Sequence, residues 1–532
     1  MYFPTTTTQA FSAVLAIILT YVAFKLSKVV YRELCSPLRD LPGPPNKSLI
    51  YGNFKEIWDS ESHAAAHEKW EETYGKTLRY RGFFGVNRVY TIDTKAVSHI
   101  LINYFDYQKP EAATYNLRKL LGEGVLLAEG EMHKRQRRVL NPAFGPSQIR
   151  ELTDIFVAKS IEMRDRWTEA ITDDGKGRVD ALSWLSKMTL DVIGLAGFNY
   201  NFDSLSDKPD KNELSQAFAT LFKAGTQANS LAVLRGLVPA LRFLPSDQDA
   251  ETKAAYQTML RIGNQLLQTG NEAVNRTRDI LSLLVRANTA KDLSDHLRLS
   301  DEDVLAQVPT FLVAGHETTS TATAWALYAL TQSPNVQTKL RKELLNISTD
   351  NPSMDELNTL PYLDAVIRES LRFHAPIPIT MRVAMKDDIL PLETPFIDKH
   401  GSLRHEIQIN KGQVILVPIL VINRSKSIWG EDAMVFKPER WESIPEAASA
   451  VPGVWGNMLT FIGGPRACIG YRFTIIEMKA LLFTLVRAFE FELAVPPQDI
   501  VKKSSIVQRP VLITHPENPN QMPLLIRSLH HS

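Results

Sequence analysis

The sequence predicts a mainly helical protein with small β-sheets, an α+β fold, preceded by an N-terminal transmembrane helix. Beyond about residue 110, most segments show apolar residues at the 3.6-residue spacing of amphipathic helices. Short runs rich in β-branched residues, such as Val89–Ile92 and Val414–Pro418, lie between them and predict strands. Near the N-terminus the chain carries no charge from Tyr2 to Phe24, which sets this segment apart from the rest.

The composition is that of a globular protein with a large core. Of the 532 residues, 44% are hydrophobic and 22% are charged, outside the ranges of disordered and collagen-like chains. Lys and Arg number 60 against 59 Asp and Glu, so the net charge of +1 gives no indication of nucleic-acid binding. The two cysteines, Cys35 and Cys468, lie in unrelated settings, which argues against a disulfide framework or a zinc cluster. Cys35 has no chemistry around it and is interpreted as incidental.

Residues 1–31 are predicted to be a single-pass membrane anchor. The segment Ala10–Phe24 is apolar apart from two hydroxyl residues, and it reaches the roughly 20 residues of a spanning helix once Lys25–Tyr31 is added, because lysines can snorkel. The alternative is a cleaved signal peptide, but such peptides place positive charge before the apolar run, and here it follows the run. The positive-inside rule then places the remainder of the chain in the cytoplasm.

Residues 32–46 are predicted to be a proline-rich linker, followed by one large domain over residues 47–532. The proline φ angles of Leu41–Pro45 are fixed, so this segment should form a stiff connector. Within the domain, helices are predicted over 63–74, 148–170, 179–198, 215–224, 252–287, 300–331, 361–375 and 469–488, and strands over 89–92, 381–383 and 414–418.

Cys468 lies in the glycine-rich segment Phe461–Gly470, which leads directly into a predicted helix. These residue types suit a cysteine bound to haem iron, since glycines let the backbone pass close to a flat macrocycle, and backbone N–H groups at a helix N-terminus stabilise a thiolate. A thiolate ligand pushes electron density onto the iron and favours O–O cleavage. The alternative, a buried free cysteine at a helix start, does not account for Phe461, Arg466 and the glycines at their positions.

The long apolar helix predicted over residues 303–331 is interrupted by the segment Ala314–Thr319. Gly315 would let haem and dioxygen approach, and the Thr318 hydroxyl can bond backwards to a carbonyl and widen the helix. Reductive activation of dioxygen needs protons, which Glu317 and Thr318 can relay through water, so both are candidate catalytic residues. For the other hydroxyl residues of this helix, packing against neighbouring helices is the better interpretation.

Together these segments resemble the cytochrome P450 family. The segment around Cys468 is similar to the family's haem-binding loop, Phe-Gly-x-Gly-x-Arg-x-Cys-x-Gly, except that Ile462 stands where the family has a small residue, and a larger residue is expected to be tolerated there. Because the acid–threonine pair and Glu369-x-x-Arg372 precede it in the family's order, the resemblance covers the chain from Leu41 onward. It implies the cytochrome P450 fold, a haem-binding catalytic domain, and haem b whose iron is axially ligated by the Cys468 thiolate.

The resemblance also implies which residues surround the haem. Arg466, Arg137 and Arg382 take the positions of propionate partners, and Phe461 belongs to the haem-binding loop. His133 stands where the family usually has a tryptophan; it can still donate an N–H to a propionate, and a solvent-facing histidine is the alternative.

Glu369, Arg372 and Arg440 are implied to form a buried triad that fixes the cysteine loop. Without the resemblance, Glu369 and Arg372 would be read as a helical surface ion pair worth little. The triad is therefore expected to be structural and not catalytic.

The implied activity is that of a monooxygenase, in which one atom of O2 enters a lipophilic small molecule of secondary metabolism and the other leaves as water. The chain has no nucleotide-binding fingerprint, so NADPH-derived electrons are expected through a separate NADPH-cytochrome reductase, with cytochrome b5 as a second candidate donor. A basic face of Lys134, Arg135 and Arg138 could dock an acidic reductase, although a solvated charge run explains it almost as well. The implied location is the endoplasmic reticulum membrane.

Two other functions stay open. A family member that rearranges a peroxide without outside electrons would share the cysteine loop, but such members tend to lack the acid–threonine pair. A haem-based sensor or carrier would need neither Glu317 nor Thr318. Oxidation of terpenoids, polyketides, fatty acids and foreign compounds all fit the sequence.

Overall fold

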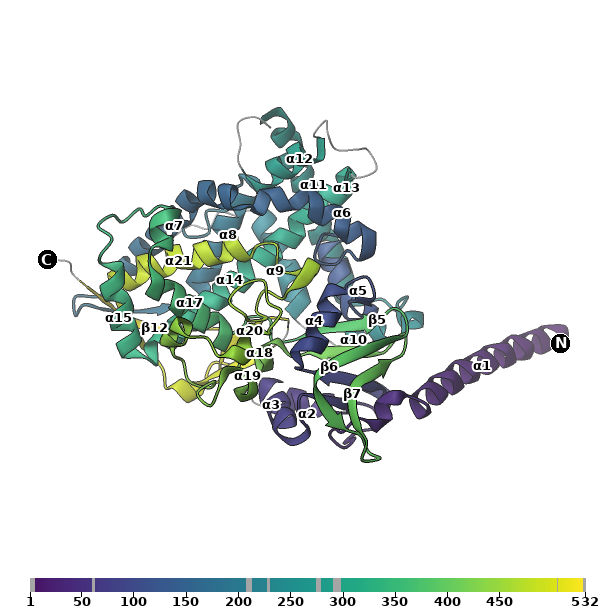
Figure 1. Ribbon diagram of the computed structural model, residues 1–532. Helices are drawn as coiled ribbons and strands as arrows, with labels where there is room; N and C mark the ends of the chain where they lie inside the picture. The colour runs from purple at the N-terminus through teal and green to yellow at the C-terminus, as the bar shows by residue number, and fades with distance from the viewer. Residues whose placement is uncertain are drawn as a thin grey trace.

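The computed structural model of the protein describes residues 5–59, 63–206, 213–226, 230–273, 279–289, 298–504 and 506–529. Most of this part of the chain is helical (Figure 1). Its helices are α1 (Thr5–Leu34), α2 (Phe54–Asp59), α3 (His63–Tyr74), α4 (Thr94–Ile102), α5 (Glu111–Leu121), α6 (Gly130–Leu140), α7 (Pro146–Glu169), α8 (Ala181–Phe198), α9 (Glu213–Thr226), α10 (Ser230–Leu237), α11 (Asp247–Ala273), α12 (Ile280–Thr289), α13 (Asp301–Leu305), α14 (Gln307–Thr331), α15 (Pro334–Leu344), α16 (Met354–Asn358), α17 (Pro361–Phe373), α18 (Ile419–Ile422), α19 (Lys426–Trp429), α20 (Glu446–Ser449) and α21 (Tyr471–Ala488). Its strands are β1 (Thr77–Arg81), β2 (Asn87–Thr91), β3 (Tyr107–Gln108), β4 (Lys176–Asp180), β5 (Thr380–Ala384), β6 (Asp388–Ile397), β7 (Leu403–Ile409), β8 (Val414–Val417), β9 (Phe489–Leu493), β10 (Ile500–Ser504), β11 (Gln508–Leu512) and β12 (Pro523–Ser528).

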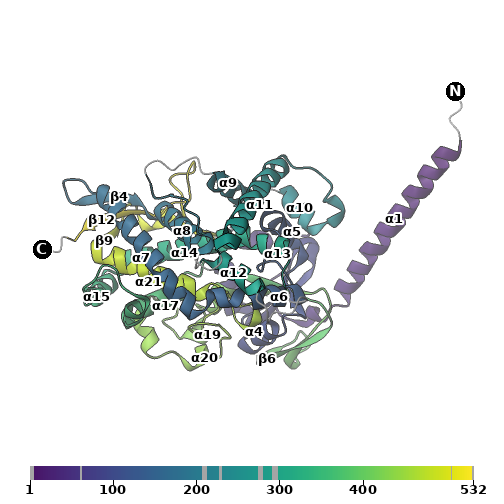
Figure 2. The ribbon, with the colours of Figure 1, turned by 90° about the horizontal axis from the view of Figure 1, so that it is seen from above.

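Helix α14 forms the centre of the helical body. Helices α8, α17 and α21 pack against it, and α7 lies against α8 and α21 (Figures 1 and 2). Most of its side chains between Gln307 and Leu330 are buried, as expected for a helix that is apolar on nearly all sides. Polar groups on α14 must therefore find their partners inside the protein.

The described strands form four small sheets, with the orders β1-β2-β8-β5-β3, β4-β12-β9, β10-β11 and β6-β7. In the largest sheet β2 and β8 are parallel, and the other neighbouring strands are antiparallel. Strand β5 pairs with both β8 and β3. This pairing places the start of α5 and the segment before it next to Arg382, which lies on β5.

The predicted α+β class and most of the predicted elements are confirmed. Helices α3, α7, α8, α9, α17 and α21 and strands β2, β5 and β8 lie where the sequence predicts them, within a few residues. The helix predicted over 252–287 is instead α11 and α12, whose connection lies outside the described residues; α12 begins separately because Asp279 accepts the Ser282 N–H at 2.9 Å and caps it. The helix predicted over 300–331 also divides, into α13, which Ser300 caps, and α14.

Helix α1 projects from the body in both views (Figures 1 and 2). The segment 1–31 is helical from Thr5, and residues 1–4 lie outside the described part of the chain. The predicted transmembrane helix is not supported, because among the described residues there is no helix with the length and apolarity needed to cross a membrane. The apolar run Ala10–Phe24 makes about 22 Å of helix, against the roughly 30 Å of hydrocarbon in a bilayer. The prediction reached a spanning length only by counting the lysines that follow.

The predicted linker packs against the body of the protein. Leu38 and Leu41 are buried in a small apolar cluster with residues of the largest sheet. The backbone N–H of Arg79, on β1, donates to the Pro42 carbonyl at 2.8 Å. The connector is therefore held along the edge of the sheet and does not run free between α1 and the body.

Candidate active site

The cysteine loop, residues 461–470, immediately precedes α21. A short 3₁₀ turn over Gly464–Arg466 comes before Cys468, whose backbone N–H donates to the Phe461 carbonyl at 2.8 Å and closes the loop. The expected role of the glycines is close approach to a macrocycle. In the structure a Cβ on Gly463 would lie 1.6 Å from the carbonyl oxygen of Pro452, so this glycine is needed for packing of the loop against its own chain.

The side chain of Cys468 is accessible, although many protein atoms surround it. This desolvation raises the pKa of the thiol, while the Gly470 backbone N–H and the Arg137 guanidinium lower it by smaller amounts. Gly470 lies directly before α21, so its N–H is the helix-terminal group that the sequence predicts to act on the sulfur. A bound metal cation would favour the thiolate over the thiol, because the thiolate is the form that ligates metals.

Arg137, on α6, holds the cysteine loop from the side. One terminal nitrogen donates to the Ala467 carbonyl at 2.6 Å, and its Nε donates to the Asn141 side chain at 2.9 Å. The contact is therefore with the backbone next to Cys468. A role of Arg137 toward a propionate stays a prediction.

Three of the predicted residues meet Lys109 in a buried cationic cluster, which consists of Arg466, Arg382, His133 and Lys109. Arg382 is 3% exposed and donates to the Thr380 hydroxyl at 2.7 Å. Burial, followed by the charge of Arg466, lowers the pKa of Arg382 to about 10. Burial and the neighbouring cations, Arg466 first, lower the pKa of His133 to about 3, so this histidine is neutral at physiological pH.

Sequence analysis missed two members of this region, Lys109 and Glu129. The Lys109 ammonium donates to Glu129 at 3.4 Å, and Arg466 forms an ion pair with the same carboxylate. Burial and the charge of Arg466 lower the pKa of Lys109 to about 7, and Glu129 opposes this shift. No spacing pattern marks Lys109, which joins the cluster because β3 pairs with the strand that carries Arg382. Glu129 is the carboxylate that acts on Lys109, Arg382 and Arg466, so positive charge exceeds negative charge in this cluster.

The predicted acid–threonine pair lies in the middle of α14. The Thr318 hydroxyl donates to the Ala314 carbonyl at 2.6 Å, which is the expected backward bond, but α14 stays α-helical through this turn and is not interrupted. Glu317 is 5% exposed and forms an ion pair with Arg509 on β11. Burial raises the pKa of Glu317 to about 7, and Arg509 opposes the rise. Arg509 is a third residue that sequence analysis missed, after Lys109 and Glu129.

Gly315 lies where α8 packs closely on α14, and its expected role toward haem and dioxygen stays a prediction. A Cβ at this position would lie 2.9 Å from the Cδ1 atom of Ile193 on α8, so the glycine permits close packing of α8 on α14. The next residue, His316, belongs to the same interface, where its Nε2 lies 2.7 Å from the Ser186 hydroxyl. Neither observation supports an opening for haem and dioxygen at Gly315.

The implied triad is present and buried. Arg372 donates to both oxygens of Glu369, at 2.7 and 2.9 Å, and neither side chain is exposed. Arg440 lies 3.5 Å from the same carboxylate and also contacts Asp432 at 2.5 Å. A terminal nitrogen of Arg372 donates to the Asn423 carbonyl at 2.8 Å.

Asn423 connects the triad to the cysteine loop. Its side-chain oxygen accepts the Leu459 N–H at 2.9 Å, and its side-chain nitrogen donates to the Thr460 hydroxyl at 2.8 Å. These two residues immediately precede Phe461. The triad therefore acts on the loop through one asparagine and the backbone.

A carboxyl group outside every predicted motif is buried between α21 and α14. Glu477 is not exposed, and neither of its oxygens has a hydrogen-bond partner of ordinary geometry in the described part of the chain. Burial raises its pKa well above the usual value, and the Thr319 hydroxyl opposes this shift. Burial therefore favours the protonated form of Glu477 in the folded protein, whereas an unfolded chain would ionise it near pH 4.3.

We expect Glu477→Gln to stabilise the protein at alkaline pH. Above about pH 4.3 the unfolded state binds fewer protons than the folded state, so the free energy of unfolding falls as pH rises toward the folded pKa. Glutamine keeps the volume and removes the ionisation, so the gain should be about 1.4 kcal/mol for each unit by which burial raises the pKa of Glu477. Urea unfolding at several pH values measures it. The exposed Glu492 gives the control, and equal pH dependence of wild type and Glu477→Gln would contradict the assignment.

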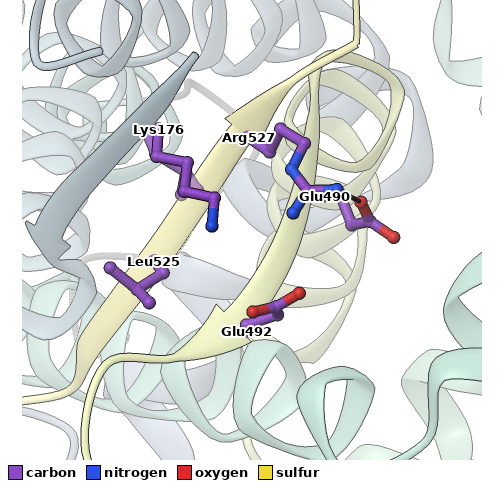
Figure 3. A pocket seen from close by; sticks show the side chains of 6 residues that line it. Lys176, Glu490, Glu492, Leu525 and Arg527 are labelled. Carbon is purple, nitrogen blue, oxygen red and sulfur yellow. Dashed lines mark hydrogen bonds and ion pairs between the residues drawn. The ribbon is translucent and has the colours of Figure 1, made fainter. Parts of the chain in front are cut away.

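A shallow hollow lies away from these residues, over the sheet β4-β12-β9 (Figure 3). Charged side chains line it, and Arg527 points toward Glu490, at a distance of 3.5 Å (Figure 3). No predicted site residue lines the hollow, so it has no part in the chemistry of Cys468.

Comparison with known proteins decides the family. The family model described as Cytochrome P450 matches residues 42–516. The chain belongs to the cytochrome P450 family. It is 54% identical over 526 residues to cytochrome P450 monooxygenase 205 of Postia placenta, which covers 96% of this chain and 97% of the relative. Cytochrome P450 monooxygenase 128 of the same fungus is 50% identical over 529 residues, covering 96% of each chain. Cytochrome P450 monooxygenase claP of Ampulloclitocybe clavipes is 36% identical over 499 residues, covering 91% of this chain and 92% of the relative.

As a cytochrome P450, the protein is a monooxygenase that uses haem b with a cysteine thiolate ligand, O2 and NADPH-derived electrons. The residues present fit this cofactor. The accessible thiol of Cys468 can reach a metal, and the excess positive charge of the cationic cluster suits the two propionates. Within the described chain, the buried Nδ1 of His133 lacks a hydrogen-bond partner, so it can contact a further polar group.

Ile462 departs from the cytochrome P450 loop pattern at a strained position. Its φ is +55°, in the left-handed region, where a β-branched residue is an outlier. The small residue of the family pattern is thus explained by the backbone. The expected tolerance of a larger residue holds only at a cost of about 1–2 kcal/mol.

We expect Ile462→Gly to be more stable than Ile462→Ala by about 1–2 kcal/mol. Both variants lose the same packing of the isoleucine, but alanine keeps the left-handed strain and glycine does not. At ordinary loop positions alanine is the more stable of the two, because glycine costs more entropy on folding. Urea unfolding of the two variants gives the difference, and a more stable alanine variant would show that the loop is unstrained.

Proposed function

We propose that this cytochrome P450 takes electrons from NADPH through a separate reductase and oxidises a lipophilic small molecule of secondary metabolism. The observation that carries the proposal is the pair of buried Glu317 and partly buried Thr318 on α14, in a chain whose cysteine loop leaves Cys468 accessible. An acid next to a hydroxyl suits the delivery of protons to dioxygen, which peroxide rearrangement does not require. The relatives from two fungi support a fungal enzyme of this type.

The proposed haem-binding residues are those of the loop and the cationic cluster. Cys468 would ligate the iron, Phe461 belongs to the loop that carries it, and a haem held by thiolate supplies cleavage of the O–O bond. The members of the cationic cluster would hold the propionates. Arg137 would support the loop from its contact with Ala467 and contribute positive charge near the sulfur.

Glu317 and Thr318 are proposed to handle protons. Because the pKa of Glu317 is about 7, its carboxyl group can gain and lose a proton near neutral pH, as a general acid must. The hydroxyl hydrogen of Thr318 is directed to the Ala314 carbonyl, so the lone pairs of its oxygen can accept a hydrogen bond from a proton donor.

Reconstitution with a reductase tests the function. The haem-loaded enzyme, a fungal NADPH-cytochrome reductase and isotope-labelled dioxygen are combined with a panel of lipophilic compounds, with and without cytochrome b5. We expect NADPH- and reductase-dependent products that carry one labelled oxygen atom. Rearrangement of an organic hydroperoxide without NADPH or reductase would instead establish the peroxide-rearranging alternative. Haem binding without any turnover would favour a sensor or carrier.

The proposed location is the endoplasmic reticulum membrane, with the catalytic domain in the cytoplasm and attachment through α1. Exposed apolar side chains support this, among them Ile17 and Phe24 on α1, at 69% and 62%, and Phe243 on the body, at 77%. The division into an anchor over 1–31, a linker over 32–46 and a catalytic domain over 47–532 is part of the same proposal. Fractionation of cells that express the full chain or residues 32–532 tests it, since only the full chain should resist alkaline extraction from membranes.

A further inference from the structure

Glu317 is held by an arginine from outside its own helix. Two nitrogens of the Arg509 guanidinium, Nε and a terminal nitrogen, contact the same carboxylate oxygen of Glu317. The two side chains are only 12% and 7% exposed. Two contacts from one planar guanidinium to one oxygen fix the position of that oxygen and favour the ionised carboxylate. The closed pair therefore restricts where the acid beside Thr318 can point.

The backbone next to Arg509 is anchored on α14 itself. The Gln508 carbonyl accepts the indole N–H of Trp325 at 2.8 Å. The backbone N–H of Gln508 donates to the Pro376 carbonyl at 2.7 Å. Trp325 follows Glu317 on α14 by about two turns, roughly 12 Å. One helix thus carries both the acid and the anchor of the strand that supplies its partner.

The titratable groups on the neighbouring elements have other surroundings than the Glu317 carboxylate. These groups are His316 on α14 with Ser186, Asp191 on α8 with Lys159, Lys187 on α8 over the Trp184 ring, Glu213 on α9 with Arg261, Glu369 on α17 with Arg372, Glu477 on α21 near Thr319, and Lys502 on β10 over the Trp325 ring. Arg509 is the charged group that acts on Glu317.

We propose that Arg509 is a positioning residue for proton delivery, which holds the Glu317 carboxylate in one orientation beside Thr318 and keeps it ionised between proton transfers. The proposal rests on the monooxygenase function proposed above and adds a residue from outside the helix that carries the acid–threonine pair. In one cycle Glu317 takes one proton from solvent, which weakens its ion pair with Arg509. It then passes that proton toward the reacting oxygen and returns to the paired carboxylate, so one proton and no electron moves.

Two opposing effects set the pKa of Glu317. Burial favours the neutral carboxyl, and Arg509 favours the carboxylate, so that the pKa of Glu317 lies at about 7. Without the guanidinium only burial would remain. Glu317 would then keep its proton across the working pH range and could not return to the carboxylate after each transfer.

Infrared titration of the haem-loaded enzyme tests the role of Arg509. The band of the protonated carboxyl group is followed with pH, and the Glu317→Gln variant serves as the reference that isolates Glu317. We expect Arg509→Met to raise the titration midpoint by about 1–3 pH units, the effect of a close opposite charge. Arg509→Lys should restore part of the shift, because it keeps the charge but loses the two-nitrogen contact. The control is Lys503→Met, since exposed Lys503 lies opposite Arg509 on β10.

An unchanged midpoint in both Arg509 variants would overturn the proposal, and so would an equal rise in Lys503→Met. The pH profile of reductase-driven turnover is a second readout, whose acidic and alkaline limits should move upward with the midpoint in Arg509→Met but not in Lys503→Met. Failure of the proposed function is seen separately, as the absence of a thiolate-type spectrum or of reductase-dependent turnover in wild type. The infrared titration depends on neither the spectrum nor turnover, so the two failures can be told apart.

Discussion

Replacing Cys468 with serine is expected to abolish the carbon monoxide difference band of thiolate-ligated haem and all reductase-dependent turnover. Serine has nearly the same size, so the loop can keep the hydrogen bond from the residue 468 N–H to the Phe461 carbonyl. A serine hydroxyl, however, does not ionise near neutral pH and cannot push electron density onto iron as a thiolate does. The effect should therefore be a loss of function below detection, with a change in stability of less than about 1.5 kcal/mol.

The dithionite-reduced, membrane-expressed protein gives the measurement, as the position of the Soret band under carbon monoxide. Cys35→Ser is the matched control, because Cys35 is the other cysteine of the chain and lies at the end of α1, far from the loop in sequence. A strongly red-shifted band in wild type and in Cys35→Ser, but not in Cys468→Ser, is the expected result. A shifted band that survives in Cys468→Ser would mean that another residue ligates the iron.

The cysteine loop and the Glu369–Arg372 pair could be predicted from sequence because each is carried by residues close together in the chain. The Cys468 loop spans ten positions, and Glu369 and Arg372 are one helical turn apart. The helices were likewise predictable from local periodicity. The divisions of the predicted helices 252–287 and 300–331 were missed. They depend on the helix caps Asp279 and Ser300, each a signal of a few residues, whereas the apolar periodicity continues across both segments.

The partners of the site residues could not be predicted, since they come from distant segments. Arg509 reaches Glu317 across 192 positions of the chain, and Lys109 joins Arg382 through the pairing of β3 with β5. A single basic residue on a short strand has no pattern that distinguishes it from a solvated one. The close contact of Gly315 with Ile193 of α8 could not be predicted either, because it depends on how two helices pack.

The prediction of a membrane anchor over residues 1–31 depended on the minimum length of a spanning helix. The run Ala10–Phe24 falls short of a bilayer, and adding residues with lysines brought it to the required length. In the described chain α1 is a helix with exposed apolar side chains but does not reach the apolarity of a spanning segment. Sequence analysis correctly placed a helix there, whereas its transmembrane character is not supported.

Replacing Glu369 with glutamine is expected to destabilise the protein by about 3–5 kcal/mol, the cost of removing one partner of a buried ion pair. The change keeps the volume of the side chain but leaves Arg372, which is fully buried, without a counter-ion. Arg440 loses the same carboxylate and keeps Asp432, which is 41% exposed. With a typical stability of about 5–15 kcal/mol, such a loss removes between about a fifth and all of the free energy of unfolding.

The loss should also appear in haem content before unfolding is complete. Glu369 orients Arg372, Arg372 donates to the Asn423 carbonyl, and Asn423 binds the backbone just before Phe461, so the cysteine loop loses its support. Haem per protein and the urea midpoint are measured together. The control is Glu169→Gln, because Glu169 pairs with Arg166 at the same i, i+3 spacing on α7 but is 64% exposed, and its loss should change stability by less than about 1 kcal/mol. If Glu369→Gln were as mild as this control, the buried triad would not be what holds the loop.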